Sequence, residues 1–211
     1  MLDEKQIIEL LKYGERINLE CKKAEGKLPN SIWETYSSFA NTSGGIILVG
    51  VEEHMKEIDP SKRFTFVNVE NAERRIIEFW NTINSDKVNI NILVDENIGI
   101  CQIDGKKILW IEVPQADYKQ RPVYINGNPI KGSYKRNNEG DYHCTEEEVK
   151  AMLRDANDSG NDGGTLNGYT MDDIDINSLR SYRIEFEHRN PEHIWNSLDD
   201  VQFLKNMGGY I

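Results

Sequence analysis

The sequence has 211 residues, of which 38% are hydrophobic and 29% are charged, and its formal net charge is −11. Its longest apolar run, Ile46 to Val51, is far shorter than the roughly 20 residues of a membrane span, and the polar start MLDEKQ argues against a signal peptide. The three cysteines lack C-x-x-C pairing, which argues against a disulfide framework and against a zinc site. We expect a cytoplasmic globular protein that does not contact a membrane.

The first third of the chain predicts helices and strands in alternation. Apolar residues alternate with polar ones around Leu19, so Glu20 and Lys22 are expected on the open face of a half-buried strand. The residues NTSGG then end an amphipathic helix, and an uninterrupted apolar run follows, as expected of a strand covered on both faces. In chain order we expect a helix over Glu4–Lys12, a strand over Arg16–Lys22, a helix over Ser31–Ala40 and a strand over Ile46–Val51.

The middle of the chain predicts one more helix and several short strands. Asp104-Gly105 is a hairpin signal, and Thr145 with Glu148 forms a capping box that opens a helix reaching about Leu153. The remaining predictions are a helix over Val69–Ser85 and three strand-like runs, over Asn89–Val94, Gly99–Ile103 and Lys107–Val113.

These patterns predict an α+β fold with a single mixed β-sheet and a few packing helices. We place this domain at residues 1–154, a flexible linker rich in Gly, Asn and Asp at residues 155–169, and a short helical extension at residues 170–211. The extension ends directly after the helix stop Gly208-Gly209, so we expect it to be truncated.

Several motifs resemble those of the Schlafen-type AlbA-like domain family. In order, they are Glu15-Arg-Ile-Asn-Leu-Glu20-Cys-Lys22, Ser38-Phe-Ala-Asn-Thr-Ser-Gly-Gly45, the strand Ile46–Val49, Gly50-Val-Glu-Glu53, Pro122-Val-Tyr and Tyr134-Lys-Arg136. The resemblance covers roughly residues 10–153. The resemblance extends to bacterial proteins classed as transcriptional regulators, in which such a domain binds DNA. In those proteins the domain is followed by a segment that resembles GYTMDDIDINSLRSYRIEFEHRNP of this chain. The chain contains no complete helix-turn-helix.

The resemblance also implies a candidate catalytic and metal site. Glu15, Glu20 and Glu53 match three carboxylates that form an RNA-cleaving centre in some Schlafen nucleases, where they would bind Mg²⁺ or Mn²⁺. The alternative is that Glu15 and Glu53 are solvated strand ends. The turn after Glu53 lacks the family's glycines, and Cys21 replaces its frequent aromatic residue, so we favour binding over catalysis.

Four cations are candidate contacts for nucleic-acid phosphates: Lys22, Lys23, Lys135 and Arg136. Their alternative role is ion pairing with nearby glutamates. The acidic total counts against nucleic-acid binding, because binding depends on phosphate neutralisation. Residues 1–150 carry a net charge of −5 and residues 151–211 a net charge of −6, so the shorter part is more acidic by proportion and a basic face could exist on the longer one.

The turn at Asn41, Gly44 and Gly45 also has two interpretations. Its glycines could bring backbone amides close to a phosphate, or they could serve only to reverse a helix into a buried strand. An ATP-binding label has been attached to this family, but the chain has no G-x-x-x-x-G-K-[ST], so we do not expect ATP hydrolysis.

Three functions remain open at this point. The first is a DNA- or RNA-binding module that requires no cofactor. The second is a ribonuclease that depends on Mg²⁺ or Mn²⁺. The third is a dimerisation or protein-interaction module, in which two copies pair to build one groove.

Overall fold

The computed structural model of the protein describes residues 2–12, 18–23, 26–54, 56–57, 62–157 and 170–208. The chain divides into two compact units, Met1–Asp158 and Ser159–Ile211. Helices and strands are mixed along the chain, which confirms the predicted α+β class. In the described ranges no helix is long and apolar enough to cross a membrane.

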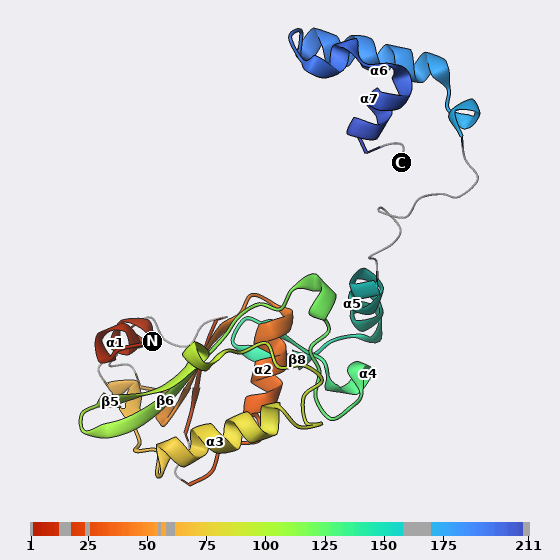
Figure 1. Ribbon diagram of the computed structural model, residues 1–211. Helices are drawn as coiled ribbons and strands as arrows, with labels where there is room; N and C mark the ends of the chain where they lie inside the picture. The colour runs from red at the N-terminus through yellow and green to blue at the C-terminus, as the bar shows by residue number, and fades with distance from the viewer. Residues whose placement is uncertain are drawn as a thin grey trace. The chain divides into compact units, whose positions relative to one another are not determined.

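The first unit contains a mixed sheet, two small hairpin sheets and five α-helices among its described residues (Figure 1). Its helices are α1 (Glu4–Leu11), α2 (Ile32–Asn41), α3 (Ala72–Ile83), α4 (Pro129–Gly132) and α5 (Glu146–Asn157), with 3₁₀ turns at η2 (Asp95–Asn97) and η3 (Tyr118–Gln120). Its strands are β1 (Leu19–Lys22), β2 (Gly45–Val49), β3 (Val51–Glu53), β4 (Phe64–Phe66), β5 (Ile98–Ile103), β6 (Lys106–Val113), β7 (Tyr134–Asn137) and β8 (Gly140–His143).

The main sheet has the strand order β1-β2-β6-β5, so β1 lies at an edge. Strands β1 and β2 run parallel, with Glu20 opposite Ile47 and Lys22 opposite Val49. The β2–β6 and β6–β5 pairs are antiparallel. Two short antiparallel sheets, β3–β4 and β7–β8, accompany it.

Each face of the main sheet carries its own apolar core. On one face Ile47 and Val49 of β2 pack in a cluster with Tyr36 and Phe39 of α2 and Phe79 of α3. On the other face the alternate residues of β2 and β6 pack with α1, β3 and β4, in a cluster that includes Ile7, Leu11, Leu48, Val51, Ile108 and Trp110. The prediction of a strand covered on both faces is therefore confirmed for β2.

The predicted strand over Ile46–Val51 is interrupted at Gly50. This glycine has a φ of +95°, and a Cβ atom there would lie 2.6 Å from the carbonyl oxygen of Val67. After Gly50, β3 leaves the main sheet and pairs with β4. The close approach of two backbones thus divides one apolar run into two strands.

The prediction of a strand over Asn89–Val94 is wrong, because the structure has no strand there. The hydroxyl of Tyr36 donates to the carbonyl oxygen of Ile90 at 3.2 Å and accepts from the amide of Ile92 at 3.0 Å. A side chain of α2 therefore binds backbone groups that a strand would use in its ladder. The apolar alternation reflects packing of irregular chain against the core.

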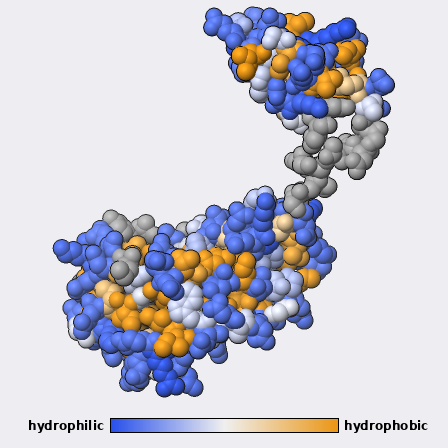
Figure 2. All heavy atoms as spheres, in the orientation of Figure 1, coloured by the Kyte–Doolittle hydropathy of each residue, from blue (hydrophilic) through white to orange (hydrophobic). Residues whose placement is uncertain are grey.

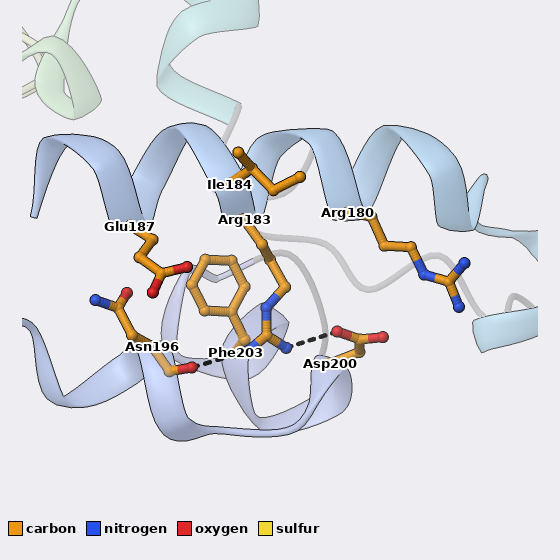
Figure 3. Close-up of a pocket in the computed structure, with 7 residues that line it drawn as sticks. All are labelled: Arg180, Arg183, Ile184, Glu187, Asn196, Asp200 and Phe203. Carbon is orange, nitrogen blue, oxygen red and sulfur yellow. Dashed lines mark hydrogen bonds and ion pairs between the residues drawn. The ribbon is translucent and has the colours of Figure 1, made fainter. Parts of the chain in front are cut away.

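The second unit contains α6 (Ile176–Arg189) and α7 (Asp200–Asn206), with 3₁₀ turns at η4 (Met171–Asp173) and η5 (Ile194–Ser197). Arg183 of α6 connects this helix to α7 and to the segment before it (Figure 3). It donates to Asp200 at 2.6 Å and to the carbonyl oxygen of Leu198 at 2.5 Å. Its guanidinium lies 4.9 Å from the ring centroid of Phe203. The helical extension predicted after the linker is therefore present. Residues 158–169, most of the predicted linker, lie outside the described residues, and α5 extends through Asn157.

Candidate functional site

Glu20 is the centre of a charged cluster at the edge of the main sheet. Because side chains of a strand alternate, Glu20 and Lys22 leave β1 on the same face, and the Nζ atom of Lys22 donates to Glu20 at 2.9 Å. The second carboxylate oxygen of Glu20 lies 2.9 Å from Nη2 of Arg136 on β7. One carboxylate therefore holds two of the cations that the sequence had suggested as phosphate contacts.

Arg136 is almost completely buried, with an exposed fraction of 4%. Besides Glu20, it donates to Asp141 on β8 at 2.9 Å and to the carbonyl oxygen of Leu19 at 3.3 Å. Its guanidinium lies 5.2 Å from the ring centroid of Phe39 on α2. A planar guanidinium suits such a site, because it can serve carboxylates and an aromatic face at once.

Asp141 connects this cluster to α2. It accepts hydrogen bonds from the hydroxyls of Thr35 at 2.6 Å and Ser38 at 2.5 Å. We call Glu20, Lys22, Arg136 and Asp141, with these two hydroxyls, the Glu20 network. Asp141 was not among the predicted site residues, because the pattern of the sequence did not predict β8. The signal was present in Asn137-Asn-Glu-Gly140, where Asn138 has a φ of +53° in a tight hairpin turn.

The Glu20 network contains two carboxylates and two cations, so its formal charges cancel. The side chains of Lys22 and Glu20 are only 9% and 16% exposed. The face of β1 expected to be open is thus covered, because α2 and the β7–β8 hairpin pack over it. Lys22 and Arg136 form the ion pairs with glutamate that were one alternative for them, and their contact with phosphate stays a prediction.

Lys135 alternates with Arg136 on β7 and therefore points away from the network, whereas Lys23 directly follows the last residue of β1. Lys23 lies 3.1 Å from Glu52 and its side chain is 46% exposed. Lys135 lies 2.5 Å from Glu148, at the start of α5, and its side chain is 36% exposed. Both lysines can therefore reach an external ligand without unfolding the network.

The three carboxylates proposed as a metal site are not seen together. Glu15 lies outside the described residues. Glu53 is on β3, its side chain is 6% exposed, and it accepts from Nε of Arg63 at 2.6 Å, whereas Glu20 binds Lys22 and Arg136. No group of three or more His, Cys, Asp or Glu side chains within the described ranges could hold a metal ion. The ribonuclease hypothesis stays a prediction.

Asn41 holds α2 to two other segments. Its Nδ2 donates to the carbonyl oxygens of Val123 at 2.8 Å and Tyr134 at 3.0 Å, and its Oδ1 accepts from the amide of Val123 at 2.8 Å. The side-chain amide of Asn41 is therefore directed into the domain, where it forms hydrogen bonds with backbone groups of Val123 and Tyr134.

Gly44 and Gly45 are placed where no side chain fits. Gly44 has a φ of +73°, and a Cβ atom would lie 2.8 Å from the carbonyl oxygen of Val113. A Cβ atom on Gly45 would lie 2.7 Å from the ring of Phe39. The amide of Gly44 donates to the carbonyl oxygen of Phe39 at 2.8 Å, so it is already used within the turn. These contacts account for both glycines without a phosphate.

The most strongly shifted pKa values belong to core groups. Burial raises the pKa of Tyr36 to about 12 and that of Cys144 to about 11. A thiol or phenol that holds its proton so tightly is not an activated nucleophile. Neither group suggests covalent catalysis.

The fold and this site define an α+β domain with a charged, hydrogen-bonded network at the edge of a mixed sheet. The family model described as Schlafen, AlbA_2 matches residues 15–145. Because this match covers more than half of the chain, the protein belongs to the Schlafen AlbA_2 family, and the resemblance seen in the sequence is confirmed. A second model, described as Domain of unknown function (DUF8451), matches residues 150–211. A search of curated proteins found no match.

The solved structures that resemble the chain include the following two. The N-terminal domain of a RecG-related protein from Nitrosomonas europaea, solved in solution, has 23% identity and a TM-score of 0.51, with 69% of this chain and 95% of that chain covered. A protein from Corynebacterium diphtheriae has 16% identity and a TM-score of 0.45, with 95% of this chain and 40% of that chain covered. At such identities, the first likeness shows a shared fold.

Proposed function

We propose that this protein is a nucleic-acid-binding module that uses the exposed cations beside the Glu20 network to contact phosphates. Membership of the Schlafen AlbA_2 family supports this function. The observation that carries it is the pairing of Glu20 and Asp141 with Lys22 and Arg136. This pairing neutralises the carboxylates at the edge of the sheet, so they do not repel a phosphate there.

Lys23 and Lys135 are the proposed first contacts, because their side chains are the exposed ones among the four candidate cations. Each now pairs with a surface carboxylate. Such pairs contribute little to stability, typically about 0.2–1 kcal/mol, so a phosphate can replace the carboxylate at small cost. Lys22 and Arg136 support the site from within, and direct contact by them requires rearrangement of the network.

A binding titration tests this function. Fluorescence anisotropy would be measured at low salt with labelled single- and double-stranded DNA and RNA of the same sequence, with EDTA in one series and Mg²⁺ or Mn²⁺ in another. We expect binding in EDTA, because the proposed phosphate contacts are lysines and involve no metal. Comparison of the four probes ranks the substrates. The RecG-related neighbour is named as a DNA helicase relative, so DNA is the first choice. Absence of binding to all four probes rejects the function.

A role in transcriptional regulation is a finer proposal that requires a specific target sequence. Selection of bound duplexes from a random DNA library tests it. An enriched sequence motif supports regulation, whereas recovery of random sequences limits the module to non-specific binding.

A second candidate function is dimerisation or another protein contact, favoured by the surface of the C-terminal unit. Apolar side chains reach that surface among hydrophilic ones (Figure 2), and Ile184 and Ile194 are 69% and 78% exposed. Light scattering over a concentration series tests it with the double variant Ile184→Ser and Ile194→Ser. A dimer in the native protein that the variant loses supports this function, and a monomeric native protein rejects self-association.

A further inference from the structure

A polar cavity lies between the loop before α2 and one side of α3, with a volume of about 460 Å³. We call it the Arg75 cavity. Its size falls within the range of about 300–1,000 Å³ that is usual for sites of small organic ligands. The lining residues that matter here are Lys27, Leu28, Trp33, Arg75, Glu78 and Lys87.

The cavity is positively charged, although the chain as a whole is strongly acidic. Lys27, Arg75 and Lys87 line it together with one carboxylate, that of Glu78. Lys27 is exposed, and Nζ of Lys87 donates to the neutral Oδ1 atom of Asn126 at 2.8 Å. Across the described part of the chain, neither lysine forms an ion pair with a carboxylate. Their charges are therefore available to an anion.

Arg75 is the buried cation of this cavity, with an exposed fraction of 8%. Its Nη1 atom donates to Glu78. Its Nε atom is buried and has no hydrogen-bond partner in the described ranges. A buried donor without a partner is unfavourable, and a guanidinium has a fork of donors that matches two oxygens of a phosphate. Arg75 thus has donor capacity that the protein itself does not use.

The Arg75 cavity is distinct from the Glu20 network. Trp33 lines the cavity and stacks on Phe79 of α3, with ring centroids 5.0 Å apart. Thr35, two residues later on α2, donates to Asp141 of the network. Two helical residues at this spacing are separated by about 200° around the helix axis. The two sites therefore lie on opposite sides of α2.

We propose that the Arg75 cavity binds the phosphate group of a small phosphorylated molecule. Arg75 would donate from inside the cavity, and Lys27 and Lys87 would complete the positive charge at its edge. Leu28 and Trp33 supply apolar surface against which the organic part of the ligand can pack. This proposal does not rest on the proposed function, because it uses none of the cations near Glu20.

Calorimetric titration of the full chain in a phosphate-free buffer tests the proposal, with inorganic phosphate and AMP as separate probes. We expect binding, with a Kd that rises at least tenfold in Arg75→Gln and a few-fold in Lys27→Gln. Tighter binding of AMP than of inorganic phosphate would show that the organic part of the ligand packs against Leu28 and Trp33. Equal binding of the two probes would show that the cavity recognises the phosphate anion alone.

Arg74→Gln is the matched control. Arg74 precedes Arg75 on α3, is 72% exposed in its side chain and pairs with the same Glu78. Because Arg74 does not line the cavity, its replacement lowers the net charge of the chain by the same amount and keeps all three lining cations. We expect native affinity in this variant. Lys27→Gln keeps the test decisive if Arg75→Gln does not fold, because Lys27 is exposed in a loop. Failure of both probes to bind, or equal affinity in the native protein, Arg75→Gln and Lys27→Gln, overturns the proposal.

Discussion

Arg136 lies 2.9 Å from Glu20, and its side chain is only 1% exposed, so this salt bridge belongs to the interior of the domain. It joins β7 to the edge strand β1, two elements that are distant in sequence. Because Arg136 also binds Asp141 at 2.9 Å, its loss would remove a cation from two largely buried carboxylates, leaving Glu20 with Lys22 and Asp141 with hydroxyl donors.

Replacement of Arg136 by methionine should therefore destabilise the domain strongly. Removal of one member of a buried ion pair typically costs about 3–5 kcal/mol, because the remaining charge stays desolvated. Urea denaturation followed by circular dichroism gives the free energy of unfolding. The control is Arg154→Met, whose side chain is 74% exposed and whose loss should change that energy by less than about 0.5 kcal/mol. Equal stability of the two variants would show that the Arg136 pairs contribute nothing.

Asn41→Asp tests whether this residue is structural. The substitution keeps the size of the side chain and an acceptor for the amide of Val123, but it places a carboxylate oxygen against the carbonyl oxygens of Val123 and Tyr134. Loss of these donors should lower the free energy of unfolding by about 1–3 kcal/mol. The exposed amide of Asn84, the residue that caps the C-terminal end of α3, provides the control Asn84→Asp. A variant that keeps its stability and loses nucleic-acid binding would instead make Asn41 a binding residue.

Gly44→Ala and Gly127→Ala separate backbone strain from crowding. Both glycines have nearly the same backbone angle, with φ of +73° and +69°. A Cβ atom on Gly127 meets nothing within 4 Å, whereas one on Gly44 would lie 2.8 Å from the carbonyl oxygen of Val113. We expect Gly44→Ala to lower the free energy of unfolding by about 1–3 kcal/mol more than Gly127→Ala does, the usual range for overpacking. Thermal or urea unfolding of both variants measures this difference. Equal losses would mean that the turn yields easily and that its glycine is not needed for packing.

Stability should fall at alkaline pH, because burial raises the pKa of Cys144 to about 11. An unfolded thiol ionises near pH 8.5. Between about pH 8.5 and 11 the unfolded state therefore binds fewer protons than the folded state, and the free energy of unfolding decreases as pH rises, by at most about 1.4 kcal/mol per pH unit for this group. Below that window the thiol has no effect.

Cys144→Ala provides the comparison for this pH dependence. The free energy of unfolding of this variant should decrease less steeply with pH between about pH 8.5 and 11. The decrease that remains at higher pH includes the ionisation of Tyr36, because burial raises the pKa of Tyr36 to about 12. Urea unfolding at a series of pH values gives both curves. Parallel curves would show that Cys144 ionises equally easily in the folded and the unfolded state.

The sequence predicted the elements whose signal is local. The apolar stripe of α2, the continuous apolar run of β2 and the capping box of Thr145 and Glu148 all specify their structure within a few residues, and each is present. The false strand over Asn89–Val94 has a different origin. Its backbone bonds depend on Tyr36, which is distant in sequence, so periodicity alone could not exclude a strand.

The candidate site was predictable only in part for the same reason. Alternation on β1 correctly placed Glu20 and Lys22 on one face, but the burial of that face depends on packing of the β7–β8 hairpin. Arg136 carried a motif signal, whereas Asp141 is an ordinary acidic residue until the hairpin brings it to Thr35 and Ser38. The Arg75 cavity had no sequence signal, since its cations come from two loops and a helix.

The salt dependence of nucleic-acid affinity tests the central claim most directly. The logarithm of the binding constant for duplex DNA would be plotted against the logarithm of salt concentration for the native chain, for Lys23→Gln with Lys135→Gln, and for the control Lys150→Gln, a lysine 67% exposed on α5. We predict that the slope becomes shallower by about 0.9 for each phosphate that the double variant no longer neutralises and that it is unchanged in the control. Identical slopes and affinities for all three proteins would contradict the claim.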